Sequence, residues 1–217
     1  MSLRTLLVLL AVCIAGWWFS PLSPRADRPL ALPAADGAIA CPPPPRVRAG
    51  AEPLQSPVPR SMPAVRLADA RLEPLHGFSV DARVLSRERY GHDREARYAP
   101  LDLALGWGRM REDAVLQRLD ISQGGRWFRY RWSDDAPLPP EEIVRSASNM
   151  HMIPANAAVA AALGRVRAGD SVRIDGWLVA LSADDGWRWR SSTSRTDTGD
   201  GACELVLVCS VTSQPGT

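Results

Sequence analysis

The residues of this chain best suited to chemistry are one histidine and two cysteines in its C-terminal third. His151 lies in the segment SASNMHMIPAN, Cys203 ends the segment SSTSRTDTGDGAC, and Cys209 follows six residues later. A histidine that takes the proton of a nearby thiol turns that thiol into a nucleophile. A catalytic role would therefore use His151 with Cys203 or Cys209, and we expect Asp197 to be the third catalytic residue.

The spacing of the cysteines limits how they pair. Cys203 and Cys209 would stand roughly 20 Å apart on one strand, which is too far for a disulfide between them. Each of them is therefore free or paired with Cys41. A free thiol would favour an enzyme, and we expect a disulfide from Cys41 to either cysteine to rule an enzyme out.

Four further residues are candidates for ligand binding. Asn149 belongs to the same segment as His151, which we expect to be a polar loop. Arg195 lies in the 13 residues from Ser191 to Cys203, which are long for a loop between two strands, and such loops are often functional. Trp107 and Trp187 would suit a groove for peptide or glycan, although aromatic side chains in a small barrel more often form its core.

Metal and cofactor sites are not indicated. His76 and His92 lack ligand spacing to His151, and the chain has neither a CxxC nor an HxxxH motif, so we expect no metal. All 26 basic residues are arginines, which excludes a phosphate-loop lysine, a Schiff-base lysine and a serine–lysine dyad. We expect no cofactor.

The charge balance bears on partners. Residues 76–217 hold 18 arginines and 19 acidic residues, so this part has a net charge of about −1. Domains that bind nucleic acid normally show a basic excess, and we therefore expect no nucleic acid as partner.

Alternating apolar and polar residues predict the elements that must position these side chains. Strands are expected at 78–84, 128–132, 171–181, 187–191 and 203–211, with an apolar stretch at 101–108. Asn156 can cap a helix over 157–163 that Gly164 ends, and a short helix is expected within 112–119. These elements predict a mainly β fold, either a small OB-like barrel or a curved antiparallel sheet with one or two short helices.

The N-terminal third has a different character. Residues 5–22 are uncharged and largely apolar, and residues 1–22 are expected to form a membrane anchor or uncleaved signal. Twelve of the 19 prolines lie between Pro21 and Pro63, so residues 23–73 are expected to be a disordered Pro/Ala/Arg-rich linker. Residues 74–217 would then form a single β-rich extracytoplasmic domain.

Three motifs carry a resemblance to known proteins. The stretches LALGWG, NMHMIPA and DTGDGACE resemble those of a group of bacterial membrane-anchored proteins to which no activity is attached. Separately, the order of His151, Gly169-Asp170 and Cys209 is similar to that of sortase-like cysteine transpeptidases. The arginine that follows the cysteine in sortases is absent here, because the chain ends eight residues after Cys209 without one.

These observations favour a binding or envelope-assembly module over an enzyme. The expected protein is a single-pass inner-membrane protein whose C-terminal domain lies in the periplasm and contacts an envelope protein. The alternative is an envelope enzyme, a thiol-dependent hydrolase or transpeptidase that uses His151 with Cys203 or Cys209.

Overall fold

The computed structural model of this chain describes residues 3–18, 20, 30–35, 39–194, 197, 199 and 201–216. Its helices are α1 (Leu3–Trp18), α2 (Asp113–Leu116), α3 (Pro140–Ser146) and α4 (Ala157–Arg165), with 3-10 turns at Glu95–Arg97 and Gly108–Arg111. The strands are β1 (Leu54–Ser56), β2 (Val65–Arg66), β3 (Ala70–Arg89), β4 (Leu101–Gly106), β5 (Asp120–Gly124), β6 (Trp127–Arg131), β7 (Ala147–Pro154), β8 (Ser171–Ala183), β9 (Arg188–Arg190) and β10 (Glu204–Gln214). The predicted mainly β fold is confirmed.

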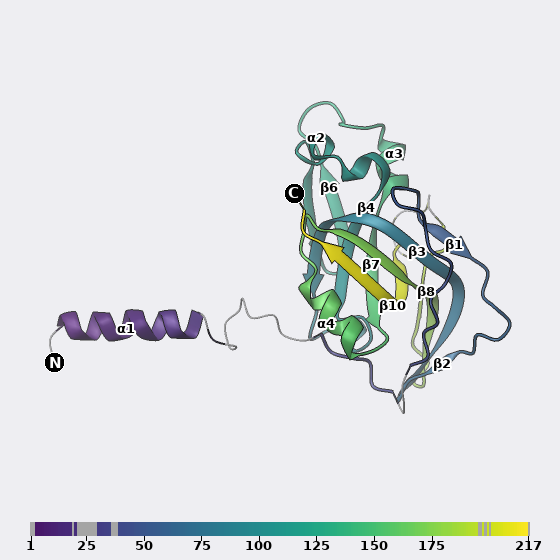
Figure 1. The fold of residues 1–217 in the computed structure, drawn as a ribbon, viewed down its shortest axis with the longest axis horizontal. Helices are drawn as coiled ribbons and strands as arrows, with labels where there is room; N and C mark the ends of the chain where they lie inside the picture. Colours follow the sequence, from purple (N-terminus) through teal and green to yellow (C-terminus); the bar gives the residue numbers. More distant parts are fainter. Residues whose placement is uncertain are drawn as a thin grey trace.

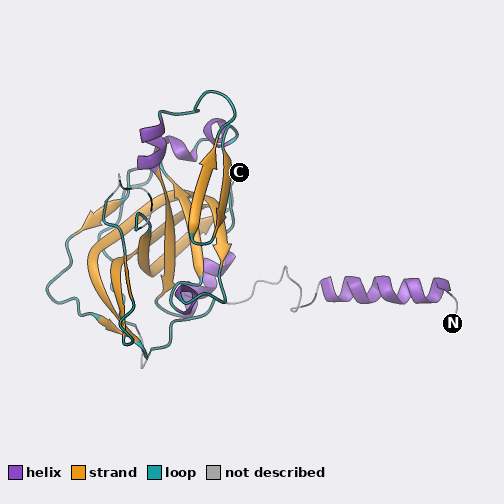
Figure 2. Cartoon of the chain, turned by 180° about the vertical axis from the view of Figure 1, so that it is seen from behind, coloured by secondary structure: helices purple, strands orange, loops and turns teal. Residues whose placement is uncertain are grey.

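Five strands pair in a closed circuit, in the order β3, β4, β7, β10, β8 and back to β3. All of these pairings are antiparallel except that of β7 with β10, which is parallel. The short strands β1 and β2 add to β3, and β9 adds to β8. Figure 1 and Figure 2 show the resulting strongly curved sheet, with β5 and β6 as a separate hairpin.

The length and composition of β3 and β8 explain the curvature. β3 spans 20 residues, so it pairs with β8 along its first part and with β4 along its last part. Gly176 of β8 lies where a side chain would meet the Leu207 carbonyl oxygen at 2.2 Å. Only glycine lets β8 and β10 approach so closely at that position.

Apolar side chains fill both sides of the sheet. One cluster includes Phe78, Leu103, Met150, Ile174 and Val206, together with Val159 and Leu163 of α4. The other includes Leu72, Ile153, Trp177 and Leu207. The predicted helix is confirmed, because the Asn156 side chain accepts a hydrogen bond from the Val159 amide at 3.0 Å, although the helix continues past Gly164 to Arg165.

Residues 39–73 correct the prediction of a disordered linker over 23–73, while 21–29 and 36–38 lie outside the described residues. This segment crosses the sheet and is fastened to it by the Cys41–Cys209 disulfide. The Trp177 indole donates a hydrogen bond to the Pro42 carbonyl at 2.9 Å, and Val47 is buried. An extended proline-rich chain keeps its carbonyls free as acceptors, so it packs here without regular structure.

The predicted membrane anchor corresponds partly to α1. This helix has 16 residues, LRTLLVLLAVCIAGWW. Within the described parts of the chain, the helices are too short or not apolar enough to count as membrane spans.

The segment around His151 is a strand and not the polar loop that its composition suggested. β7 pairs with both β4 and β10, and its residues from Asn149 to Pro154 are all buried. Met150 and Met152 face the cluster that contains Phe78, while Asn149 and His151 face the opposite side. Two buried polar side chains in one strand obscured its pattern.

Candidate functional site

The candidate site is built where three adjacent strands meet. His151 lies in β7, between β4 and β10. The β4–β7 register places Asp102 directly opposite His151, and the β7–β10 register places Leu205 opposite it on the other side. Cys203 immediately precedes β10 and thus comes beside β7. The sheet topology therefore brings together an aspartate, a histidine and a cysteine from distant parts of the sequence.

Asp102 and His151 form a buried pair. The Asp102 carboxylate is fully buried, and its Oδ1 lies 2.9 Å from Nδ1 of His151, whose side chain is 5% exposed. A carboxylate at Nδ1 fixes the orientation of the ring and leaves Nε2 for a partner on the other side. The Trp189 ring packs on the imidazole, with ring centroids 4.7 Å apart.

Cys203 is the other partner of His151. Its thiol is free and half-buried, and it lies near enough to the His151 side chain to favour the protonated ring. Burial opposes a positive charge on His151, but the interactions with Asp102 and Cys203 outweigh it and raise the pKa of His151 to about 9. His151 thus holds a proton over the neutral range. The sulfur of Cys203 therefore has beside it a group that can donate and accept a proton.

Arg126 anchors Asp102 from the far side. It occupies the tip of the β5–β6 hairpin with φ +69°, next to Gly125 at φ +58°, as a tight two-residue turn requires. Its guanidinium lies 2.8 Å from Asp102, 2.7 Å from Asp93 and 3.8 Å from the centre of the Tyr90 ring. Although burial opposes the charge, these two carboxylates raise the pKa of Arg126.

Asn149 contacts Asp102, Arg126 and Cys203. Its Nδ2 lies 3.3 Å from Asp102 Oδ2, 3.2 Å from the Arg126 carbonyl and 3.8 Å from Cys203 Sγ. Its Oδ1 accepts a hydrogen bond from Gln123 of β5 at 2.6 Å. Asn149, predicted to bind a ligand, therefore belongs to the polar network around the thiol.

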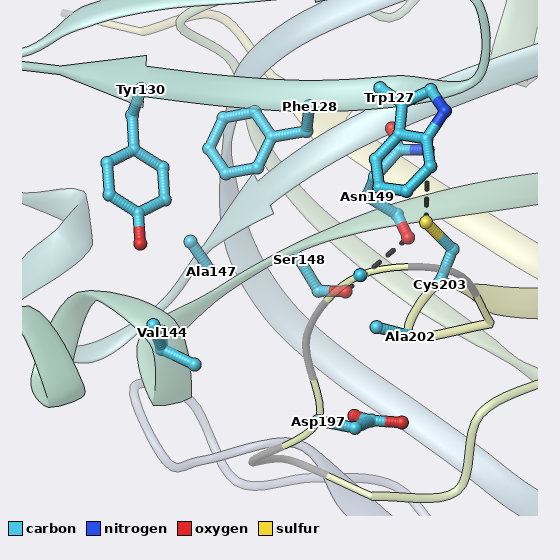
Figure 3. A pocket seen from close by; sticks show the side chains of 11 residues that line it. Trp127, Phe128, Tyr130, Val144, Ala147, Ser148, Asn149, Asp197, Ala202 and Cys203 are labelled. Carbon is cyan, nitrogen blue, oxygen red and sulfur yellow. Dashed lines mark hydrogen bonds between the residues drawn. The ribbon is translucent and has the colours of Figure 1, made fainter.

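A cavity of about 210 Å³ opens beside Cys203. As Figure 3 shows, aromatic side chains of β6 form one wall, and α3, the start of β7 and the segment before β10 form the others. Its lining residues are Trp127, Phe128, Tyr130, Val144, Ala147, Ser148, Asn149, Asp197, Gly199, Ala202 and Cys203. The sulfur therefore has direct access to a largely apolar space.

Asp197 does not take the third catalytic position that we predicted. It lies at the cavity wall, where its carboxylate accepts a hydrogen bond from the Ser192 hydroxyl at 2.5 Å. The carboxylate that contacts His151 is Asp102. Sequence reasoning missed Asp102, although a single charged residue inside the apolar stretch LDLALG was a usable signal.

Trp107 and Trp187 do not line the cavity beside Cys203. Trp107 is buried in the apolar core. Trp187 stacks on Tyr98 with ring centroids 6.0 Å apart, and Arg94 covers its ring at 4.7 Å. Arg195 lies outside the described residues. The structure thus brings His151, Cys203 and Asn149 together, while Trp107 lines a smaller cavity next to Ala202 and Trp187 packs on Trp189 beside His151.

The disulfide decides between the two cysteines. Cys209 is bonded to Cys41 and is no nucleophile, which corrects its inclusion as an alternative. By the criterion stated from the sequence, such a bond rules an enzyme out. That criterion was too broad, because the bond leaves Cys203 free and near His151.

Among the described residues, no group of three or more His, Cys, Asp or Glu side chains is arranged to hold a metal ion. Comparison of the chain with protein-family models, with curated proteins and with solved structures found no match.

Proposed function

We propose that this protein is a thiol-dependent acyl-transfer enzyme, a hydrolase or transpeptidase that uses Cys203 as nucleophile. The observation that carries this proposal is that His151 is bonded to Asp102 and lies near the free thiol of Cys203, which opens on a cavity. A nucleophile, a base and a group that orients the base are the three parts of this chemistry, whatever the fold that holds them.

Each residue has a defined role in the proposed reaction. The Cys203 thiolate attacks the carbonyl carbon of an ester or amide, and the bond from that carbon to its leaving group breaks. His151, protonated at the start, gives its proton to the departing group. Water or an amine then attacks the thioester, His151 takes the proton of the attacking molecule, and the sulfur is released. Asp102 keeps the imidazole oriented throughout.

The developing negative charge on the carbonyl oxygen needs a donor. Asn149 Nδ2, 3.8 Å from the sulfur, is a candidate for this role. Its two hydrogens already have three acceptors, Asp102, the Arg126 carbonyl and the Cys203 sulfur, so a bound substrate would have to compete with them.

Hydrolysis of p-nitrophenyl acetate tests the proposal. We expect a burst of p-nitrophenolate equal to the enzyme concentration, followed by slower turnover, because acylation of Cys203 precedes deacylation. Cys203→Ala should abolish the burst, whereas Cys13→Ser, which removes the free thiol of α1, should retain it. A burst of the same size in Cys203→Ala would contradict the proposal.

We also propose an OB-like barrel for the fold and the periplasm for the C-terminal domain. The circuit of five strands, with α4 between β7 and β8, matches the description of an OB-like barrel. The Cys41–Cys209 disulfide is typical of an oxidising compartment. Together with the apolar N-terminus and the resemblance of the three motifs, it supports a membrane-anchored protein with a periplasmic C-terminal domain. We propose an envelope protein and no nucleic acid as partner.

The second candidate function is a binding or envelope-assembly module without catalysis. It is favoured by the aromatic cavity, since such a pocket can hold an apolar ligand without reacting with it. This alternative predicts that no thioester forms in the ester assay. It also predicts that Cys203→Ala and wild type bind the apolar dye anilinonaphthalene sulfonate equally.

A further inference from the structure

We propose that the cavity beside Cys203 is the acyl-group subsite of the enzyme and selects acyl donors that carry a bulky apolar, preferably aromatic, side chain. This inference rests on the proposed function and names its substrate class. It is drawn from the walls of the cavity and from the position of the sulfur in it.

Large and small side chains face one another across the cavity. Trp127, Phe128 and Tyr130 come from the β6 side, and Val144, Ala147 and Ala202 come from the opposite walls. Figure 3 shows the three rings in a row, with the sulfur below Trp127 at one end and Tyr130 at the other. The cavity exists because the side chains opposite the rings are small. It extends from the sulfur along the row of rings.

The aromatic wall is held in place by its own contacts. The ring centroids of Phe128 and Tyr130 lie 5.7 Å apart, and those of Tyr130 and Trp132 lie 6.2 Å apart. At the other end the hairpin tip is fixed by Arg126. A wall fixed in this way suits recognition of a flat apolar group, because its side chains lose little conformational freedom when the group binds.

Part of the aromatic lining of the cavity is exposed to solvent. Trp127 is 37% exposed, a high value for so large an apolar side chain. A ring bound along the wall would cover this surface and contact the faces of the aromatic side chains. An acyl group bonded to the sulfur would place its side chain in that position, whereas an acetyl group is too short to reach beyond the first ring.

Two esters with the same leaving group test this inference. With p-nitrophenyl acetate or p-nitrophenyl 3-phenylpropionate, the thiolate forms a carbon–sulfur bond and the bond to the p-nitrophenolate oxygen breaks. p-Nitrophenolate leaves with the electron pair, and water later returns the acyl group as a carboxylic acid. The measurement is the rate of thioester formation by intact-protein mass spectrometry. We expect the phenylpropionyl ester to react at least about tenfold faster, in line with what apolar pockets discriminate.

Variants of the β5–β6 hairpin test whether the cavity determines the preference between the two esters. Trp127→Ala and Phe128→Ala should each lower the ratio of the two rates about tenfold. Arg129→Ala is the matched control, since Arg129 lies on β6 with an exposed side chain outside the cavity, and it should leave the ratio unchanged.

Failure of the subsite proposal and failure of the proposed function give different results. Equal rates for the two esters in wild type, or an unchanged ratio in both cavity variants, would overturn the subsite while leaving the proposed function in place. Failure of both esters to acylate Cys203 would overturn the proposed function itself.

Discussion

The pKa of His151 is strongly shifted by its surroundings in the site. Its two neighbours, Asp102 and Cys203, favour the protonated ring strongly enough to overcome the burial that opposes it, and its pKa rises to about 9. In the unfolded chain the pKa of a histidine is about 6.5. Folding is therefore coupled to the retention of a proton on this ring.

The free energy of unfolding should consequently depend on pH. Because the pKa is raised in the folded state, the stabilisation is fully present below about pH 6.5 and is lost as pH rises through 9, with a total of about 3 kcal/mol. We expect urea unfolding at pH 6 and pH 9.5 to show this loss in wild type and not in His151→Gln. The control is His92→Gln, which replaces an exposed histidine and should retain the wild-type pH dependence. Equal pH dependence in wild type and His151→Gln would refute this coupling.

At the scale of elements, the β5–β6 hairpin is tied to the site through one side chain. Besides its carboxylate partners, Arg126 donates a hydrogen bond to the Ala99 carbonyl at 2.9 Å, and its own amide donates to the Tyr90 hydroxyl at 2.9 Å. The guanidinium is only 14% exposed. The hairpin that carries the aromatic wall is therefore fastened to the carboxylate that orients His151.

Arg126→Gln should lower the free energy of unfolding by about 1.5–3 kcal/mol, because it removes charge-assisted hydrogen bonds to Asp93 and Asp102, while Asp102 keeps His151 as a partner. Arg126→Lys should recover only part of this loss, since an ammonium cannot reproduce the planar fork that meets Asp93 and Asp102. The matched control is Arg129→Gln on the exposed face of β6, with an expected effect within about 0.5 kcal/mol. Urea unfolding measures all three variants, and a loss below 1 kcal/mol in Arg126→Gln would contradict the anchoring role.

Some of the helices and strands could be predicted from the sequence, and others could not. The regularly alternating β6, the strand β8, which follows the Gly169-Asp170 turn, and the capped helix α4 were predictable because their patterns are local. β7 was missed because Asn149 and His151, which are polar, are buried in a strand that is covered on both sides. Its status as a strand depends on β4 and β10, which are its neighbours only in the folded chain.

The site was predictable to a similar degree. His151 and Cys203 stood out by type, since few residues of their kind occur in the chain. Asp102 did not, because its role follows from the register of β4 against β7 and not from any spacing in the sequence. Arg126 was equally hidden, being one arginine among 26 until the hairpin turn places it over Tyr90.

At the scale of the whole molecule, the proline-rich segment is part of the fold. The disulfide joins cysteines 168 positions apart in the sequence and clamps the segment onto β10. Arg46 adds an ion pair with the buried Asp175 at 2.9 Å. The segment thereby covers the apolar side of the sheet that includes Trp177.

The double variant Cys41→Ser/Cys209→Ser should therefore destabilise the protein. Removal of a disulfide that closes so long a loop costs about 2–5 kcal/mol, because the unfolded chain gains freedom. Urea unfolding measures the loss, with Cys13→Ser as the control for replacing a cysteine that is not in the disulfide. An effect of the double variant no larger than that of Cys13→Ser would show that the clamp is dispensable.

Activation of Cys203 by Asp102 and His151 determines where and how fast the protein is acetylated. Brief exposure to p-nitrophenyl acetate, followed by peptide mass spectrometry, locates the acetyl group. We predict a thioester on Cys203 in wild type that forms at least about 100-fold more slowly in His151→Gln, the usual contribution of a positioned acid–base residue. An unmodified Cys203 in wild type, or equal rates in the two proteins, would contradict the claim.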